Sequence, residues 1–452
     1  MTDGKTQISK SIKIGWAIGE LGVAFYIGVS MAFFMYFLTE GLLISATYAG
    51  MALFLPRIWD AITDPLMGII SDKTHSTMGR RRPYILVGSL LFGLTFWLTL
   101  TPPAGLSEIG YVFYFSMMYI LVGTAFTIFD IPYSAMAAEM TSDYKERTNL
   151  IGYKMMGARL GIVIAAWVTP QILGLRESLM GGFALVGEIG GIFIAITGLV
   201  AFYFTKDANR TPPGKEKLSL KSLKPFTEMR KLSSNKHFKR LFIVFLLQNI
   251  AIGSGAATLI YFIITSLQQT PDKMGPLFAL AGITALVATP IWVFIGNRIG
   301  KKLSYKIAMM INTVIISSAF FLSNEYFFLI YGLYVVMGFA DAGNQLMSNS
   351  MVPDTVEYDQ HLTGMRREGI IFGAWAFCRK FGMAMGALLA SQIMGLFGFI
   401  SGAPSQTEMA EISIRISYSI FPALLWISAI ILLRKYSLGQ AEYEEIIQKN
   451  TQ

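Results

Sequence analysis

The sequence predicts an all-α membrane protein of about twelve transmembrane helices, and three observations support this fold class. First, 54% of the 452 residues are hydrophobic and only 14% are charged, and the mean hydropathy is +0.53, which is too apolar for a surface that faces water. Second, the apolar residues form stretches long enough to cross a hydrocarbon core of about 30 Å as helices. Third, basic residues occupy alternate loops.

The first half of the chain contains six predicted spans. The polar start MTDGKTQISKSIK is followed by an apolar run that is too long for a secretory signal and has no small-residue cleavage site, so we expect this run to remain as the first span. The six predicted spans are residues 14–39, 45–71, 84–101, 109–137, 150–173 and 180–205.

The second half contains six more predicted spans, which follow a polar, basic segment. They are residues 240–268, 275–296, 305–322, 326–350, 369–398 and 412–434. We therefore expect an N-terminal six-helix bundle, a central cytoplasmic loop, a C-terminal six-helix bundle and a cytoplasmic tail. Their predicted bounds are 1–205, 206–239, 240–436 and 437–452.

The two halves show weak internal similarity. GIISDKTHSTMGRRRP (68–83) follows the second span, and VFIGNRIGKK (293–302) lies at the corresponding place after the eighth. Each places a small residue and a polar residue before a basic cluster, as the loops of a two-repeat transporter would.

The distribution of charge predicts the orientation. Lys and Arg are absent from the loops near 40–47, 101–110, 323–326 and 399–412, and they are concentrated in the loops between these. The positive-inside rule therefore places both termini and the central loop in the cytoplasm. We interpret the basic segment 206–240 as a solvated linker that contacts anionic headgroups, and not as a nucleic-acid site.

Several function classes are excluded by composition. Cys378 is the only cysteine and there are three histidines, so we expect no disulfide, no zinc or haem site and no cofactor. The chain has no GxSxG, HExxH or paired His and Asp arrangement, and we therefore expect no enzyme.

The clearest functional candidates lie in RIWDAITDPLMG (57–68). Asp60 and Asp64 are four residues apart and share one helix face, and carboxylates at membrane depth are functional candidates by default. Thr63 and the carbonyl groups released by Pro65 add oxygen ligands that suit a hard cation. The alternative is an ion pair between Asp60 and Arg57, although one arginine cannot neutralise both acids.

A second candidate is Asp130 in TIFDIPYS (127–134). A carboxylate can hold sugar hydroxyl groups, and the neighbouring Tyr133 could pack against a sugar ring. The alternative is a buried acid that pairs with Lys154 or Arg159, and a charge-paired binding site would combine both interpretations.

The remaining candidates are ionisable or aromatic residues in or near spans. In REGIIFGAWAFCRKFG (367–382), Trp375 and Lys380 could reach a cavity. Glu20 could be a ligand or a member of a gate ion pair. We expect the glycines of GEIGGIF and GMAMGA to serve close helix packing. Residues expected to form a cytoplasmic gate are Asp72, Arg80, Arg147 and Arg366.

Several of these segments resemble the glycoside, pentoside and hexuronide cation symporters, a melibiose-carrier-like family of the major facilitator superfamily. They are RIWDAITDPLMGIISDKT, GRRRPYI, FDIPYSAM, DYKERTNL and VEYDQHLTGMRREG, and the similarity covers most of the chain.

The resemblance implies a major facilitator fold and specific roles for the candidates. Asp60 and Asp64 match the cation-binding acids, Thr63 stands where the melibiose carrier has an asparagine ligand, and Thr127 matches a threonine of the same site. Asp130 matches a sugar-binding aspartate, and Lys380 a lysine near the sugar. The chain departs from the pattern at Ala24, where the melibiose carrier has an aspartate, and at Ser134, which replaces an aromatic residue.

We therefore expect a monomeric, multi-pass carrier of a bacterial inner membrane that couples Na+ or H+, with Li+ as a further possibility, to a small sugar-like solute by alternating access. An anionic sugar such as a uronide is a variant of this hypothesis. The alternatives are a cation-coupled lysophospholipid carrier, because animal lysophospholipid carriers share the aspartate motif, and a non-transporting membrane sensor.

Overall fold

The computed structural model describes residues 8–141, 144–208, 234–364 and 367–438, and all regular elements in these ranges are helical. The chain divides into two compact units, Met1–Leu223 and Lys224–Gln452. The predicted basic central segment lies largely outside the described residues.

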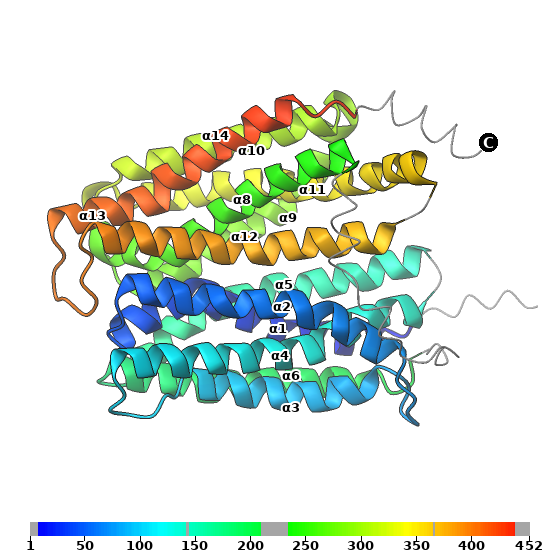
Figure 1. Ribbon diagram of the computed structural model, residues 1–452, viewed down its shortest axis with the longest axis horizontal. Coiled ribbons are helices and arrows are strands. Elements are labelled where there is room, and N and C mark those ends of the chain that lie inside the picture. Colours follow the sequence, from blue (N-terminus) through cyan, green and yellow to red (C-terminus); the bar gives the residue numbers. More distant parts are fainter. Residues whose placement is uncertain (1–7, 142–143, 209–233, 365–366, 439–452) are drawn as a thin grey trace, which may run out of the picture. The chain divides into compact units, whose positions relative to one another are not determined.

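The first unit is built from long helices whose positions follow the predicted apolar stretches (Figure 1). Helix α1 packs against α5 and α6, α3 packs against α4 and α6, and α2 packs against α4. The helices are α1 (Lys10–Tyr36), α2 (Ala46–Asp72), α3 (Arg82–Thr99), α4 (Glu108–Met140), α5 (Tyr144–Leu173) and α6 (Leu179–Phe204), and α1 continues as a π-helical turn, η1 (Phe37–Gly41).

The second unit repeats this packing. Helix α8 packs against α12 and α14, α9 against α11, and α10 against α11 and α14. The long helices are α8 (Lys236–Tyr261), α9 (Met274–Ile299), α10 (Lys301–Ser318), α11 (Leu329–Thr363) and α12 (Glu368–Leu396), and the last hairpin ends in α13 (Glu408–Arg415) and α14 (Phe421–Arg434). The π-helical turns are η4 (Phe262–Ser266) and η8 (Ile416–Ile420), and the 3-10 turns are η5 (Pro271–Lys273), η6 (Ala319–Phe321) and η7 (Asn324–Tyr326).

The first helix of each unit ends in the same way. After η1, the amide of Leu42 bonds the Phe37 carbonyl and the amide of Ile44 bonds the Leu38 carbonyl, both at 2.9 Å. After η4, the amide of Leu267 donates a hydrogen bond to the Phe262 carbonyl at 3.0 Å, and the amide of Gln269 donates one to the Ile263 carbonyl at 2.9 Å. Between the two bonded amides of each turn lies one residue with a positive φ. It is Leu43 after η1, with a φ of 57°, and Gln268 after η4, with a φ of 51°. The two halves therefore share a structural repeat.

Local sequence accounts for the starts and ends of many helices. The side chains of Ser9, Ser107, Ser178 and Asn235 accept bonds from backbone amides in the first turns of α1, α4, α6 and α8, which satisfies donors that have no partner within the helix. Gly364 ends α11 in the left-handed conformation that glycine adopts without strain.

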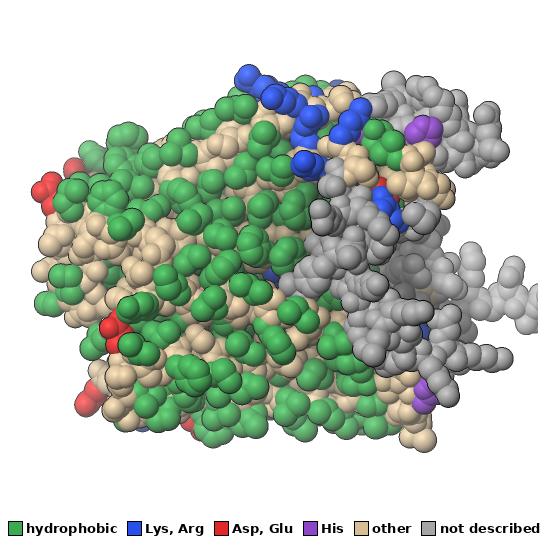
Figure 2. Space-filling model, viewed as in Figure 1, with side chains coloured by type: hydrophobic (Ala, Val, Ile, Leu, Met, Phe, Trp, Pro, Cys, Tyr) green, Lys and Arg blue, Asp and Glu red, His purple; other side chains and the backbone are tan. Residues whose placement is uncertain are grey.

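The outer surfaces of both units are apolar. Large aliphatic side chains such as Ile192 and Val287 are 56% and 64% exposed, and hydrophobic side chains cover the face seen in Figure 2. Among the described residues, nine helices are long and apolar enough to cross a membrane. Helices α2, α11 and α12 are as long but are not among the nine, because their spans contain more charged and polar residues.

The glycine-rich segments serve close packing, as predicted. A Cβ at Gly191 would lie 2.5 Å from the carbonyl oxygen of Gly93, and one at Gly386 would lie closer still to that of Ile250. Helices α3 and α6, and likewise α8 and α12, therefore approach each other at distances that a larger residue would prevent.

Candidate functional site

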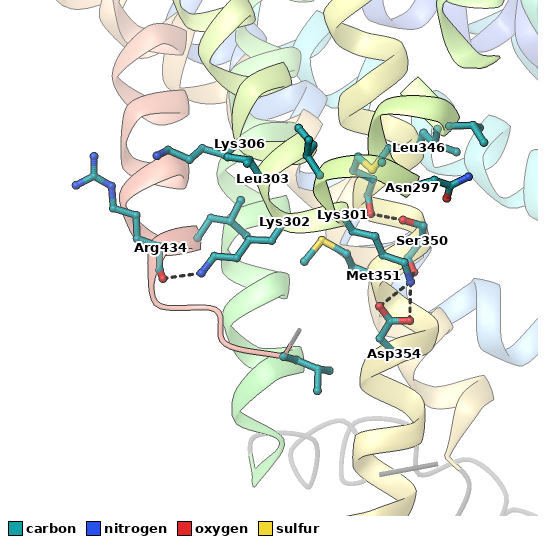
Figure 3. Close-up of a pocket in the computed structure, with 17 residues that line it drawn as sticks. Asn297, Lys301, Lys302, Leu303, Lys306, Leu346, Ser350, Met351, Asp354 and Arg434 are labelled. Atoms are coloured by element: carbon teal, nitrogen blue, oxygen red, sulfur yellow. Dashed lines mark hydrogen bonds and ion pairs between the residues drawn. The ribbon is translucent and has the colours of Figure 1, made fainter. Parts of the chain in front are cut away.

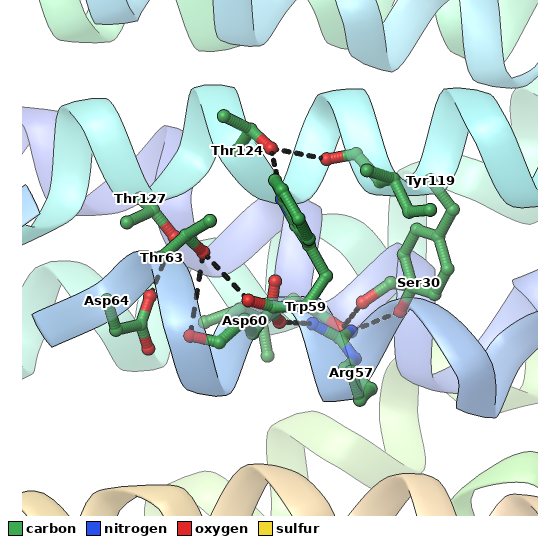
Figure 4. A network of polar contacts seen from close by, with 11 residues as sticks. Ser30, Arg57, Trp59, Asp60, Thr63, Asp64, Tyr119, Thr124 and Thr127 are labelled. Atoms are coloured by element: carbon green, nitrogen blue, oxygen red, sulfur yellow. Dashed lines mark hydrogen bonds and ion pairs between the residues drawn. The ribbon is translucent and has the colours of Figure 1, made fainter. Parts of the chain in front are cut away.

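The middle of α2 carries a buried acid that is paired with a basic residue. Asp60 is 4% exposed, and Nη1 of Arg57 lies 2.9 Å from its Oδ2. The other end of the guanidinium group donates to the hydroxyl of Tyr119 on α4 and lies over the Tyr119 ring. The predicted alternative of an Arg57–Asp60 ion pair is therefore present in the structure, and it is anchored to a second helix (Figure 4).

The second acid of α2 is bound by α4 through a hydroxyl group. Thr127 Oγ1 donates to Asp64 Oδ1 at 2.7 Å, and Trp59 Nε1 donates to Thr124 Oγ1 at 2.9 Å. The Thr63 hydroxyl is 3.2 Å from the Trp59 carbonyl oxygen of its own helix. The structure thus brings together Asp60, Thr63, Asp64 and Thr127, which are the four residues predicted to hold the coupling cation (Figure 4).

A glycine of α4 leaves space beside the first acid. A Cβ placed on Gly123 would lie 2.9 Å from Asp60 Oδ1, whereas the hydrogen bond from Arg57 goes to the other oxygen, Oδ2. Gly123 lies one turn before Thr127, on the same face of α4. Sequence reasoning assigned glycines to packing alone and missed this position, because only the packing of α4 on α2 shows what Gly123 faces.

The donors of this cluster suit a hard cation. Two carboxylates and two hydroxyl groups provide only oxygen, which Na+ and other hard cations prefer. Thr63 and Thr127 each use the hydroxyl proton as a donor, so the lone pairs of both oxygens can face a cation. A proton on one carboxylate would serve the same electrostatic purpose.

A chain of polar contacts links α4, α5 and α1. Ser134 Oγ donates to Asp130 Oδ1 at 3.2 Å, and Lys154 Nζ donates to Ser134 Oγ at 2.6 Å. Lys154 also lies 3.3 Å from Glu20 Oε2. Three of the residues predicted to bind the solute, Asp130, Lys154 and Glu20, are therefore connected, and Lys154 reaches Asp130 through Ser134.

Tyr133 lies in the helix-packing layer of this region. Its ring is 0% exposed and lies between Trp16 and Phe129, with centroids at 5.2 and 5.1 Å. Its hydroxyl donates to the Trp16 carbonyl at 2.5 Å, and Lys154 Nζ is 5.1 Å from the ring centroid. In this arrangement the ring faces protein on both sides and lies beside Lys154, and its predicted packing against a sugar stays a prediction.

The other residues predicted to contact the solute are Arg159, Trp375 and Lys380. Arg159 lies beyond Lys154 near the middle of α5 and is partly exposed. In the second unit, Trp375 stacks on Phe245 at 3.7 Å and donates to Asn349 Oδ1 at 3.0 Å. Lys380 is partly exposed on α12.

Charged groups cluster at the basic end of the first unit. Arg80 and Arg81 both contact Glu139 at the end of α4, at 2.5 and 3.2 Å, and Asp72 accepts from Arg81 at 2.9 Å. The predicted gate residues Asp72 and Arg80 therefore lie in one ion-pair network. The side chain of Arg147 and the whole of Arg366 lie outside the described residues.

Sequence reasoning also missed polar groups of the second unit. Asp341 lies within the predicted span 326–350, where its carboxylate accepts from Asn312 of α10 at 2.7 Å, and the rule that selected Asp60 would have selected it. Asp359 and Arg367 form a buried two-bond ion pair at 2.7 and 2.8 Å. The pairing of Asp359 depends on how the chain returns after Gly364, which ends α11, and the sequence does not show which basic residue then meets Asp359.

Comparison with known sequences identifies relatives along the whole chain. The profile of the family described as MFS/sugar transport protein matches residues 15–440. The uncharacterized symporter YnaJ of Bacillus subtilis is 27% identical, with 99% of this chain and 96% of YnaJ covered. The glucuronide carrier protein homolog of Escherichia coli is 26% identical, with 98% and 95% covered. The sodium-dependent lysophosphatidylcholine symporter 1 of Xenopus tropicalis is 25% identical, with 98% and 90% covered.

Comparison with solved structures identifies the fold. The nucleoside transporter NupG, in a mutant form, superposes with a TM-score of 0.71 and 13% sequence identity, and the match covers 93% of this chain and 99% of NupG. At this identity the likeness shows a shared fold and does not bear on role or substrate.

Proposed function

The chain belongs to the MFS/sugar transport protein family, and on that premise we propose that it is a secondary transporter that carries a sugar or sugar derivative together with Na+ or H+ by alternating access. It is a multi-pass membrane transporter and not an enzyme. The acid pair of α2 is the single observation that carries the coupling proposal.

We propose that the cation binds beside Asp60 and Asp64, with the hydroxyl groups of Thr63 and Thr127 as further ligands. Two carboxylates one turn apart repel each other, and the ion pair that Arg57 forms at 2.9 Å is with Asp60. A bound cation would offset this repulsion and draw α2 towards α4, where Thr127 already contacts Asp64.

Asp130 is the proposed link between cation and solute. It lies one turn after Thr127 on α4, so a shift of α2 against α4 would be transmitted along one helix. Its carboxylate can accept from sugar hydroxyl groups, and Ser134 and Lys154 hold it in place. Lys154 and Arg159 are basic groups that an acidic group of the solute could contact, so an anionic sugar such as a uronide is the proposed variant, although Glu20 and Asp130 lie in the same network.

A lysophospholipid is the second candidate solute. It is favoured by the sodium-dependent lysophosphatidylcholine symporter, which is similar along 98% of this chain. The phosphate group of such a lipid could contact the same basic residues, and the chemistry of the site therefore does not separate the two candidates.

We also propose twelve membrane crossings with both termini in the cytoplasm. Helices α2, α11 and α12 would complete the nine apolar spans found among the described residues, because each is at least as long as a bilayer core requires. Their polar residues would then face the interior of a unit, as Asp60 and Asp359 do.

Uptake into proteoliposomes tests the substrate class. A panel of neutral glycosides, their uronic acids and a lysophospholipid would be offered under an imposed Na+ or H+ gradient. We expect accumulation of a sugar compound, with the uronide preferred over its neutral counterpart. Equal competition by the neutral glycoside would reject the anionic variant, and accumulation of the lysophospholipid alone would replace the sugar by the lipid.

A further inference from the structure

A basic pocket lies at one end of the second unit, away from the residues discussed above. Its volume is about 1090 Å³, which is enough for a ligand the size of a drug molecule. It is formed by the last turn of α9, the first turns of α10, the polar half of α11 and the end of α14 (Figure 3). Its charged residues are Lys301, Lys302, Lys306, Asp354 and Arg434.

The single acid among the lining residues, Asp354, forms an ion pair with Lys301. Lys301 Nζ contacts both carboxylate oxygens of Asp354, at 2.8 and 2.7 Å, and donates to the Ser350 carbonyl at 3.0 Å. Lys302 Nζ donates to the Arg434 carbonyl at 2.9 Å, and a neutral carbonyl does not cancel its charge. Among the pocket's lining residues, Lys302, Lys306 and Arg434 therefore have no acid to balance them (Figure 3).

The position of the lysines increases this imbalance. Helix α10 begins at Lys301, and its first turn contains no acidic residue. The N-terminus of a helix carries a partial positive charge and exposes backbone amides, so it favours anions and disfavours lysines. Lys302 and Lys306 are also one turn apart and repel each other. An anion in the pocket would balance the unmatched basic charge, accept from backbone amides at the start of α10 and reduce the repulsion between the two lysines.

Apolar side chains border the same pocket. Val293, Ile299 and Leu303 line it and are 44%, 42% and 46% exposed. These residues lie at the end of α9 and the start of α10, two of the apolar spans. Lys and Arg side chains gather over this end of the second unit in Figure 2. A ligand that suits the pocket would thus be negatively charged at one end and apolar at the other.

We propose that this pocket binds the headgroup of an anionic phospholipid of the membrane leaflet at the basic end of the chain. The phosphate lies against the first turn of α10 and is contacted by Lys302, Lys306 and Arg434, and the acyl chains follow the apolar border formed by Ile299 and Leu303. Basic pockets between transmembrane helices are known to select such lipids.

Native mass spectrometry of the full-length purified chain tests this proposal. The protein would be equilibrated with an equal mixture of phosphatidylglycerol and phosphatidylcholine that have the same acyl chains, and the ratio of bound lipids would be measured. Each removed charge should lower the preference for phosphatidylglycerol roughly fivefold, and the triple variant Lys302→Gln, Lys306→Gln, Arg434→Gln on the order of 100-fold. The matched control removes the same charge from the first unit through Lys10→Gln, Lys73→Gln and Lys206→Gln, and should change the ratio little.

A second variant tests the proposal independently, in case the triple variant does not fold. Asp354→Asn leaves Lys301 without its acid and should raise the preference for phosphatidylglycerol severalfold. Equal lipid ratios in the wild type and the triple variant would overturn the proposal. So would thermal stabilisation of the wild type by inorganic phosphate or ATP without preference for phosphatidylglycerol, because a soluble anion would then be the ligand.

Discussion

At the scale of single residues, each carboxylate of α2 is held by a different chemical group. Asp60 has the guanidinium group of Arg57 at 2.9 Å, and Asp64 has the hydroxyl of Thr127 at 2.7 Å. A buried charge that loses its partner is destabilised by about 3–5 kcal/mol. Arg57 therefore offsets the charge of Asp60, whereas Thr127 gives Asp64 a hydrogen bond that carries no charge.

Gly123→Ala should weaken cation binding without preventing folding. The added Cβ would lie 2.9 Å from Asp60 Oδ1, so either the carboxylate or α4 must move, at a cost of about 1–3 kcal/mol. We expect the cation concentration for half-maximal uptake to rise roughly tenfold. Gly332→Ala, where a Cβ meets no atom within 4 Å, is the control, and an equal response of both variants would contradict the role of Gly123.

Ser134→Ala should weaken solute binding and leave the cation dependence unchanged. The Ser134 hydroxyl stands between Lys154 Nζ at 2.6 Å and Asp130 Oδ1 at 3.2 Å, and hydrogen bonds to charged groups contribute about 1.5–3 kcal/mol. We expect the KM for the solute to rise roughly tenfold in uptake assays. Ser428→Ala, at an exposed serine that bonds its own helix, should leave KM unchanged, and a shift in cation dependence with unchanged KM would contradict this assignment.

Part of this site can be predicted from sequence because acids are rare in apolar spans. That rule is enough to select Asp60, Asp64 and Asp130. It could not supply Gly123 or Tyr119, because their roles depend on which face of α4 meets α2. Tyr133 follows Asp130 by three residues, so the two side chains share one face of α4, which predicts a sugar contact. The sequence could not show that the Tyr133 ring is buried against Trp16 of α1.

At the scale of elements, the ends of the helices are less predictable than their middles. Helix α2 (Ala46–Asp72) matches its predicted range 45–71 closely, whereas α11 continues to Thr363, well past the predicted end at 350. Hydropathy detects only the apolar part of a helix, whether it faces lipid or the protein interior. The last turns of α11 are polar and are held by contacts with other elements, such as Lys301 with Asp354.

Replacing the residues of positive φ after the two π-helical turns should stabilise both units. Leu43 and Gln268 have φ of 57° and 51°, where a side chain costs roughly 1–2 kcal/mol and glycine costs none. Leu43→Gly and Gln268→Gly should each raise the thermal unfolding midpoint in detergent. Leu90→Gly, within α3 and similarly exposed, should lower it, and a matching fall for Leu43→Gly would show that no strain is present.

Breaking the buried ion pair between Asp359 near the end of α11 and Arg367 should destabilise the second unit. Asp359 is 0% exposed and receives two bonds from Arg367, so Arg367→Ala leaves an unpaired buried charge and should cost about 3–5 kcal/mol. The double variant Asp359→Asn, Arg367→Gln should recover part of this loss in thermal unfolding. Equal thermal unfolding midpoints for the single and double variants would indicate that the two side chains stabilise the unit through packing alone and not through their charges.

At the scale of the whole molecule, the two units share a structural repeat. Each unit has the same turn after its first helix, at η1 or η4, and an ion pair at its basic end. The weak similarity of 68–83 and 293–302 predicted this duplication, and Arg80 with Glu139 corresponds to Lys301 with Asp354. The proposed function adds a thermodynamic requirement. If cation and solute are coupled, each must raise the affinity for the other by the same factor.

The most direct test of the coupling is accumulation of the solute in proteoliposomes under an imposed cation gradient, compared between the wild type and Asp60→Asn. Asp272→Asn, at an acid in the 3-10 turn η5 before α9, is the control for loss of one carboxylate. We expect the wild type and the control to accumulate solute above equilibrium and Asp60→Asn to reach equilibrium only. Undiminished, gradient-driven accumulation by Asp60→Asn would contradict coupling through Asp60 and leave the α2 acids with a structural role.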